Sequence, residues 1–183
     1  MSSASPTAAP VPATDPQETH RRLAQTARLL GYAGLIPFFA GAAGVWLAEH
    51  PFDLMAHKAQ LSYGAVILAF LGAVHWGLVL RMPYGVPRAL LVWGVVPTLV
   101  GWAALAFGPP LAHGVMMLGF LAAFLADYRA SLSGLTPTWY ARLRLVLTTL
   151  VLLALAVSGL RFLVYPLFDH VSLVPAAAEG LAI

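Results

Sequence analysis

One histidine lies deep inside an apolar segment of the sequence. His75 is five residues from the end of the apolar run 61–80, which corresponds to about 8 Å of helical rise. An ionisable group is unfavourable against lipid, so its position marks a candidate functional site. A neutral imidazole there can relay protons, hold a quinone carbonyl or ligate a metal. The structural alternative, which we favour, is a hydrogen bond to a neighbouring helix, with Trp76 as an interfacial aromatic residue.

A second polar group belongs to the same side of the predicted membrane. Asp127 ends an apolar run, and a carboxylate at a helix C-terminus opposes the helix dipole, so a compensating cation is expected. The candidate polar rim consists of His75, Trp76, Asp127, Arg129, Arg142 and Arg144. Its three arginines are the candidate partners of the Asp127 carboxylate. We interpret this rim mainly as structural anchoring. An acidic-headgroup site or a quinone site is the alternative.

The other side of the predicted membrane carries a second set of histidines. Two histidines and two acids fall within nine residues, and two further histidines are expected on the same face: Glu49, His50, Asp53, His57, His113 and His170. Imidazole and carboxylate groups suit first-row metals, but this spacing matches no closed ligand motif. We therefore predict no metal ligands and no cofactor. Whether these histidines meet in space is left open by the sequence.

The elements that must position these groups are apolar throughout. The chain is 60% hydrophobic and only 9% charged, whereas a soluble domain is about half apolar and about a quarter charged. Five runs approach or reach the length of about 20 residues that crosses a bilayer, namely 29–48, 61–80, 89–107, 111–126 and 143–160. The sequence therefore predicts an all-α fold, a polytopic bundle of five transmembrane helices. This composition excludes an ordinary soluble enzyme, a disordered chain and a nucleic-acid-binding module.

Basic residues divide unequally between the two sides of this bundle. Eight of the ten Lys and Arg residues fall before the first run or in the second-to-third and fourth-to-fifth connections. This bias predicts a cytoplasmic N-terminus and an outside C-terminus. We expect residues 1–20 to form a Pro-rich disordered cytoplasmic tail, 21–166 the transmembrane domain, and 167–183 a short extracytoplasmic tail.

Two prolines and an internal similarity suggest how the helices are organised. Pro37 and Pro97 lie eight or nine residues inside the first and third runs, where each removes a backbone donor and is expected to break or kink its helix. Residues 34–41 are similar to 94–101, and 64–71 are similar to 114–121. A true duplication would make the bundle two parallel-related helical hairpins plus one helix. Chance similarity between Ala/Gly/Leu-rich helices is the alternative.

Small residues recur along the second run. Ala65, Ala69, Ala73 and Gly77 follow one another at intervals of four residues. This spacing lets a neighbouring helix backbone approach closely. The pattern indicates that the stripe faces protein, which is either another helix of this chain or a partner subunit.

Several segments resemble a known family. They are 31–38 (GYAGLIPF), 63–77 (YGAVILAFLGAVHWG), 93–97 (WGVVP) and 139–148 (WYARLRLVLT). Together they resemble a family of small bacterial inner-membrane proteins classed only as a domain of unknown function, which is also similar to a mitochondrial transmembrane protein of animals. The resemblance covers about residues 21–160. It implies a multi-pass location in the inner membrane and no established catalytic activity.

Three functions fit these features. The first, which we favour, is a non-enzymatic accessory or assembly component of a membrane complex, with the lipid bilayer and a membrane-protein partner or a second copy of the chain as its contacts. The second is a small transporter or channel built on the proline-broken helices, although the spans contain almost no polar residues near the midplane. The third is a quinone- or lipid-linked membrane enzyme that uses His75.

Overall fold

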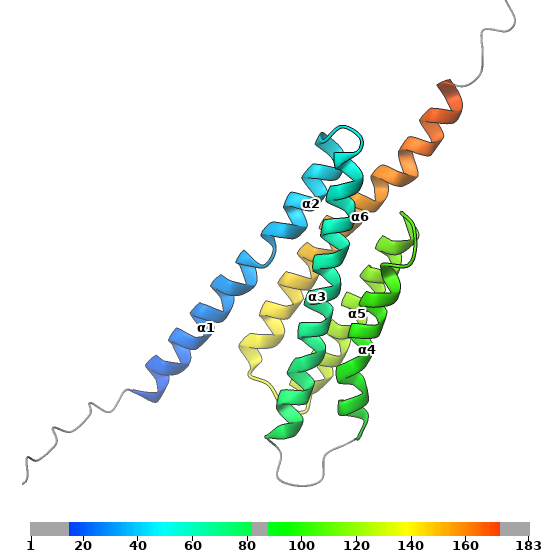
Figure 1. Ribbon diagram of the computed structural model, residues 1–183. Helices are drawn as coiled ribbons and strands as arrows, with labels where there is room; N and C mark the ends of the chain where they lie inside the picture. Colours follow the sequence, from blue (N-terminus) through cyan, green and yellow to red (C-terminus); the bar gives the residue numbers. More distant parts are fainter. Residues whose placement is uncertain (1–14, 82–87, 173–183) are drawn as a thin grey trace, which may run out of the picture.

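The computed structural model describes residues 15–81 and 88–172, and all regular secondary structure within these ranges is helical (Figure 1). The helices are α1 (Pro16–Ala33), α2 (Ile36–Leu47), α3 (Phe52–Leu80), α4 (Arg88–Ala104), α5 (Leu111–Leu132) and α6 (Thr138–Ser172). The predicted tails lie mostly outside the described residues. Within the described residues, helical structure begins at Pro16 and continues to Ser172.

The apolar helices have the lengths that a membrane bundle requires. Within residues 15–81 and 88–172, four segments are long and apolar enough to cross a bilayer: Gln17–Leu47, which combines α1 and α2, and then Phe52–Leu80, Leu111–Leu132 and Trp139–Val164. Helix α4 is also apolar but has 17 residues, or about 25 Å, against a hydrocarbon core of about 30 Å. The predicted helical membrane bundle is therefore confirmed, with the third run as its shortest member.

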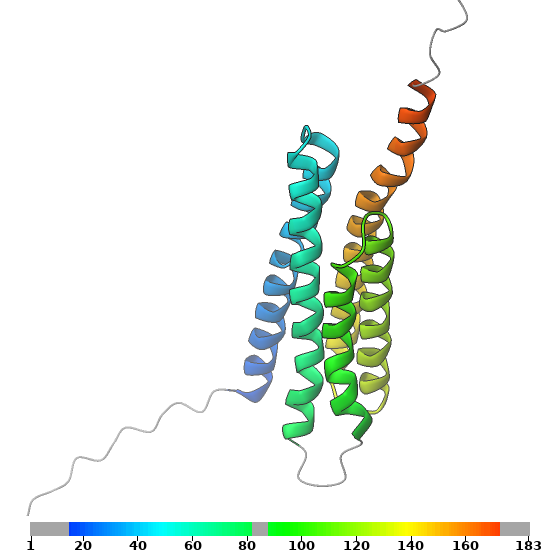
Figure 2. The same cartoon turned by 45° about the vertical axis from the view of Figure 1, so that its right-hand side comes forward.

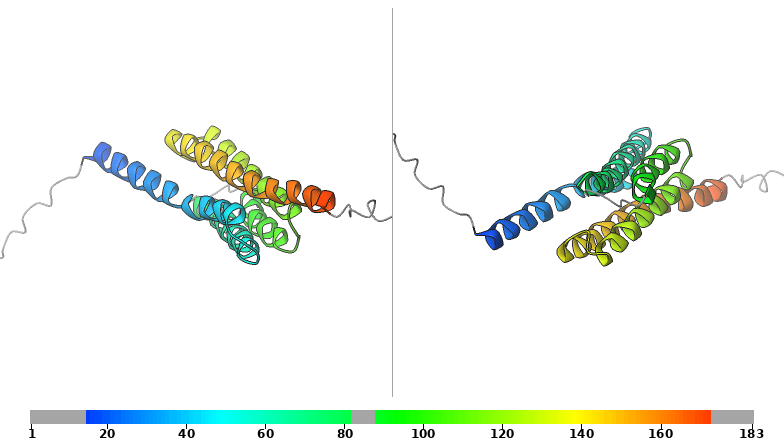
Figure 3. Two further views of the ribbon diagram at one scale, coloured as in Figure 1. Left: turned by 90° about the horizontal axis from the view of Figure 1, so that it is seen from above. Right: turned by 90° about the horizontal axis from the view of Figure 1, so that it is seen from below.

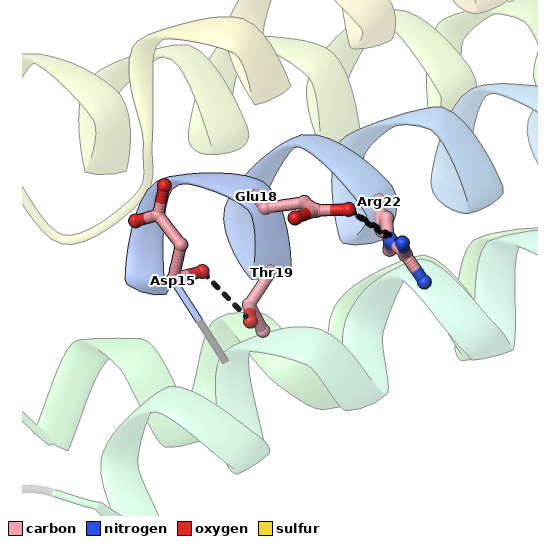
Figure 4. Close-up of polar contacts among 4 residues, drawn as sticks. All are labelled: Asp15, Glu18, Thr19 and Arg22. Atoms are coloured by element: carbon pink, nitrogen blue, oxygen red, sulfur yellow. Dashed lines mark hydrogen bonds and ion pairs between the residues drawn. The ribbon is translucent and has the colours of Figure 1, made fainter. Parts of the chain in front are cut away.

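The beginning of α1 follows from its capping residues. The Asp15 carboxylate accepts a hydrogen bond from the Gln17 amide at 2.9 Å, and Pro16 occupies the first turn, where a missing amide is tolerated. The Thr19 hydroxyl donates to the Asp15 carbonyl at 3.2 Å, and Arg22 pairs with Glu18 one turn earlier (Figure 4). These local contacts start the helix upstream of the apolar run.

Helix α3 is the centre of the bundle. It packs against α2, α4 and α5, while α6 packs against α5, α2 and α1 (Figure 2). Seen along the bundle, α1 projects beyond the footprint of α3–α5 and runs beside the first half of α6 (Figure 3). The start of α1, the ends of α3 and α5, and the starts of α4 and α6 lie at one end, which we call the basic end.

Aromatic and aliphatic side chains fill the middle of the bundle. The ring of Phe38 makes edge-to-face contacts with Tyr63 and Phe120, at centroid distances of 5.2 and 5.7 Å. Leu68 and Leu155 are fully buried beside them. The core therefore joins α2, α3, α5 and α6.

Glycines let α3 and α4 approach most closely. A Cβ at Gly72 would overlap the Gly94 carbonyl, and one at Gly101 would come within 2.9 Å of the Ala65 Cα. Part of the predicted small-residue stripe thus faces α4. Gly77, the last member of the stripe, has nothing within 4 Å of an added Cβ.

The two prolines occupy different environments. The first span is interrupted at Gly34–Leu35, and Pro37 lies in the first turn of α2. Amides in the first turn have no acceptor within the helix, so the missing amide of Pro37 removes no helical hydrogen bond. The Tyr63 hydroxyl donates to the Gly34 carbonyl across this break at 3.0 Å. Pro97 instead lies inside α4, whose helical structure continues through it. The first span is thus interrupted near Pro37, whereas α4 is helical on both sides of Pro97.

Side chains that donate to backbone carbonyls connect the spans. Gln60 donates to Phe38 at 2.8 Å, Trp76 to Leu91 at 3.1 Å, Trp46 to Val157 at 2.9 Å and Arg161 to Val45 at 3.1 Å. Such bonds fix the rotation of one helix against another in an environment where water does not compete.

Candidate functional site

Three of the predicted rim residues form a buried network. The Arg144 Nε donates to Asp127 Oδ2 at 2.6 Å, and His75 Nε2 lies 3.7 Å from Asp127 Oδ1. His75, Asp127 and Arg144 are 2%, 3% and 6% exposed. The short first distance is that of a charge-assisted bond, whereas 3.7 Å is an electrostatic contact without a hydrogen bond.

Three different helices supply these side chains. His75 comes from the last third of α3, Asp127 from the last turns of α5 and Arg144 from the second turn of α6. All three positions are near the basic end because the segments alternate in direction along the bundle. The His75 Nδ1 faces the Leu71 carbonyl one turn earlier, at 3.4 Å. The network therefore ties α3, α5 and α6 together.

The pairing neutralises two charges inside the bundle. Of the three arginines considered for Asp127, the structure selects Arg144, because Arg129 and Arg142 are exposed. Trp76 is 44% exposed and bonds the α4 backbone. The structure thus brings together half of the predicted rim and leaves Trp76, Arg129 and Arg142 at its surface. Removal of one partner of a buried ion pair is much more destabilising than the pair is stabilising.

Two further residues lie near the network, and of these the sequence did not single out Thr148. The Tyr140 hydroxyl interacts with the Asp127 carboxylate. Thr148, which is 3% exposed, follows Arg144 by one turn of α6, so both side chains lie on one helix face. A spacing of four between two polar residues in an apolar run is the sequence signal for this pair. The Thr148 Oγ1 and the Arg144 Nη2 are buried without a hydrogen-bond partner.

The network lies between two hollows. One, of about 480 Å³, is lined by His75 together with Trp93 of α4 and Arg129 of α5. The other, of about 530 Å³, is lined by Arg144 and Thr148 and extends between α1, α3 and α6. Both are mainly apolar in their lining and fall within the usual range for small-molecule sites.

At the opposite end of the bundle, the structure separates the residues that the sequence placed together. His50 Nδ1 lies 3.4 Å from Asp53 Oδ1 at the surface, and Glu49 is exposed. His57 instead turns inward against His113, with ring centroids 4.9 Å apart. No group of three or more His, Asp or Glu residues suitable for a metal ion occurs within 15–81 and 88–172. The side chain of His170 is not among those described.

Helical segments of membrane-spanning length, an apolar perimeter and buried charges at one end define the class: a polytopic helical membrane protein. Residues 23–160 match the family described as "Protein of unknown function (DUF3429)", and the chain belongs to this family.

Two animal proteins are similar to the chain. It is 33% identical over 152 residues to Transmembrane protein 69 of Xenopus tropicalis and 30% identical over 136 residues to that of Mus musculus. These matches cover 79% and 73% of this chain but 56% and 55% of the relatives, so the chain spans about half of their length. No solved structure matches it. The family resemblance expected from the sequence is confirmed.

Proposed function

We propose that this protein is a non-enzymatic accessory or assembly component of a membrane complex, which it joins through a partner transmembrane helix. The observation that carries the proposal is the uncovered part of the small-residue stripe on α3. Ala73 and Gly77 are exposed, although Ala65 of the same stripe is packed against α4. Exposed small residues four apart let a second helix backbone approach closely. A second copy of this chain is the other candidate for that helix.

The short helix α4 supports the same proposal. At about 25 Å it is shorter than the hydrocarbon core, and such mismatch favours helix association. Its outward face carries Val92, Leu99 and Trp102, which are all exposed. A partner helix beside α3 and α4 would cover this surface.

We propose a bacterial inner-membrane location with the N-terminus in the cytoplasm and the C-terminus outside. The basic end gathers the starts of α1, α4 and α6 (Figure 1), and α4 and α6 carry Arg88 and Arg142 there, as the positive-inside rule requires. A C-terminal fusion to a reporter that is active only outside the cytoplasm tests this orientation. Activity is expected, and activity of only a cytoplasmic reporter at the same position would reverse it.

Affinity purification in mild detergent from a chromosomally tagged strain tests the accessory role. The wild type should recover a companion membrane protein, or a second copy of itself, in a fixed ratio. Gly77→Leu should abolish that recovery, because a Cβ added at this position has nothing of this chain within 4 Å, whereas the larger side chain would obstruct the partner. The matched control is Ala40→Leu, at an exposed position on α2. Unchanged recovery with Gly77→Leu, or no companion at all, would contradict the proposal.

A further inference from the structure

An apolar groove lies between α1, α3 and α6. It has a volume of about 530 Å³, and its walls carry residues such as Leu30, Ile67, Phe70 and Leu147. Helix α1 meets the rest of the bundle mainly through α6, beside which it runs (Figure 3). The wall composition suits a long hydrocarbon chain.

Two unpartnered donors mark the polar end of this groove. Arg144 and Thr148 both line it, and both are more than nine-tenths buried. The Arg144 Nη2 and the Thr148 Oγ1 have no hydrogen-bond partner, an unfavourable state for buried polar atoms. Because the two residues lie one turn apart on the same face of α6, one acceptor oxygen between them can satisfy both.

The charge balance favours a neutral acceptor. The guanidinium of Arg144 is already paired with Asp127 at 2.6 Å. An anionic headgroup would bring a second negative charge to a buried site that holds one such cation, which is unfavourable in a low dielectric. A carbonyl oxygen accepts from both donors without adding charge.

Aromatic side chains surround the same end. Trp139 and Tyr140 line the groove from the first turn of α6, and Tyr63 lines it from α3. The Tyr63 hydroxyl is engaged by the Gly34 carbonyl, so Tyr63 contributes chiefly its ring. Aromatic rings pack well against a flat, apolar ring with a polar edge.

We propose that this groove binds an isoprenoid quinone, with one ring carbonyl accepting hydrogen bonds from Arg144 and Thr148 and the isoprenoid chain lying between α1 and α3. The site goes beyond the accessory role and does not depend on it. The proposal concerns binding and includes no electron transfer.

Quinone binding can be measured on the purified full-length chain in mild detergent. Titration with decyl-ubiquinone, followed by tryptophan fluorescence, should show saturable binding near one molecule per chain. Thr148→Val keeps the shape of the side chain and removes the donor, and should weaken binding about five- to ten-fold. Its control is Thr149→Val, because Thr149 is exposed and bonds the Leu145 carbonyl of its own helix at 2.9 Å.

A second pair of variants tests the groove itself. Ala27→Phe should block the groove, whereas Ala33→Phe, at an exposed position of the same helix, should not.

The fold does not depend on the tested hydroxyl, since Thr148 makes no hydrogen bond in the bundle. Helix content by circular dichroism should therefore be equal in all four variants. Unaltered decyl-ubiquinone affinity in Thr148→Val and Ala27→Phe, or equal losses in the variants and their controls, would overturn the site. A second measurement identifies the lipids that copurify with the protein, after their extraction into organic solvent. A phospholipid that copurifies with the wild type and is lost in Thr148→Val, without quinone, would overturn the assignment to a quinone.

Discussion

The two ends of the bundle bury histidines beside different neighbours. At the basic end, His75 lies 3.7 Å from a carboxylate that is itself bonded to Arg144. At the other end, His57 and His113 face each other, and the His57 Nδ1 and both ring nitrogens of His113 have no hydrogen-bond partner. Phe162 lies beside this pair, 5.1 Å from the ring centroid of His57.

The difference shows what buried charge and buried imidazole each require. Asp127 and Arg144 can be buried together because each compensates the other across two helices. His57 and His113 are packed as aromatic rings against each other and against Phe162. We therefore expect the basic end to depend on specific polar partners, and the opposite end to depend on ring volume.

Loss of the carboxylate should have the largest effect. Asp127→Ala leaves the Arg144 guanidinium buried without its partner and is expected to lower the free energy of unfolding by about 3 to 5 kcal/mol. Thermal unfolding in detergent, followed by circular dichroism, measures the loss. The double variant Asp127→Leu/Arg144→Leu should recover most of it. A double variant as unstable as Asp127→Ala alone would mean that the charges themselves are not the cause.

Close helix packing beside the network should have the next largest effect. Gly72→Ala places a methyl group on the Gly94 carbonyl, which is backbone and cannot move aside. We expect a loss of about 1 to 3 kcal/mol in unfolding free energy. The control, Gly77→Ala, adds the same group where nothing lies within 4 Å and should be neutral or stabilising by about 0.5 to 1 kcal/mol. Equal effects of the two substitutions on the unfolding temperature would contradict the close contact.

Substitution of a buried histidine should have a different effect on the unfolding free energy at each end of the bundle. His75→Leu removes an electrostatic contact of Asp127 and should lower the unfolding free energy by about 1 kcal/mol. His113→Leu removes two unpartnered ring nitrogens at similar volume and should cause no loss, because burial of those atoms is itself unfavourable. The comparison is made by thermal unfolding of both variants under one condition. A larger loss for His113→Leu would show that the His57–His113 pair holds a ligand or a shared proton.

Loss of a hydrogen bond from tryptophan to a neighbouring helix should have the smallest effect on stability, and the effect should be equal at both ends. Trp76 at the basic end and Trp46 at the opposite end each donate one bond to a carbonyl of a neighbouring helix. Their exposed fractions are similar, 44% and 39%. Trp76→Phe and Trp46→Phe should therefore each lower the unfolding free energy by about 0.6 kcal/mol, the average for interhelical bonds in membrane proteins. A several-fold difference between them would show that one end depends on this bond more than its geometry indicates.

The buried polar residues show which contacts could be predicted from the sequence and which could not. Asp127 was expected to have an arginine partner, and three were equally placed by sequence. Arg142 and Arg144 differ by two positions, about 200° around a helix, and only the rotation of α6 against α5 turns Arg144 inward. Likewise, the sequence placed His57 and His113 on the same side of the predicted membrane, with the acids that precede His57, and left open whether the two rings meet. The partner of His57, His113, belongs to another helix.

The sequence by itself determined the membrane class, the helical segments and the one-sided distribution of basic residues. These properties are sums over many side chains, so they can be predicted without knowledge of any single contact. Only the tertiary structure decided that α1 separates from α2 near Pro37 while α4 continues through Pro97, and which buried polar atoms have partners. Those outcomes depend on the rotation and close approach of whole helices, such as the contact of Gly72 with Gly94, and hydropathy along the chain contains no information about either.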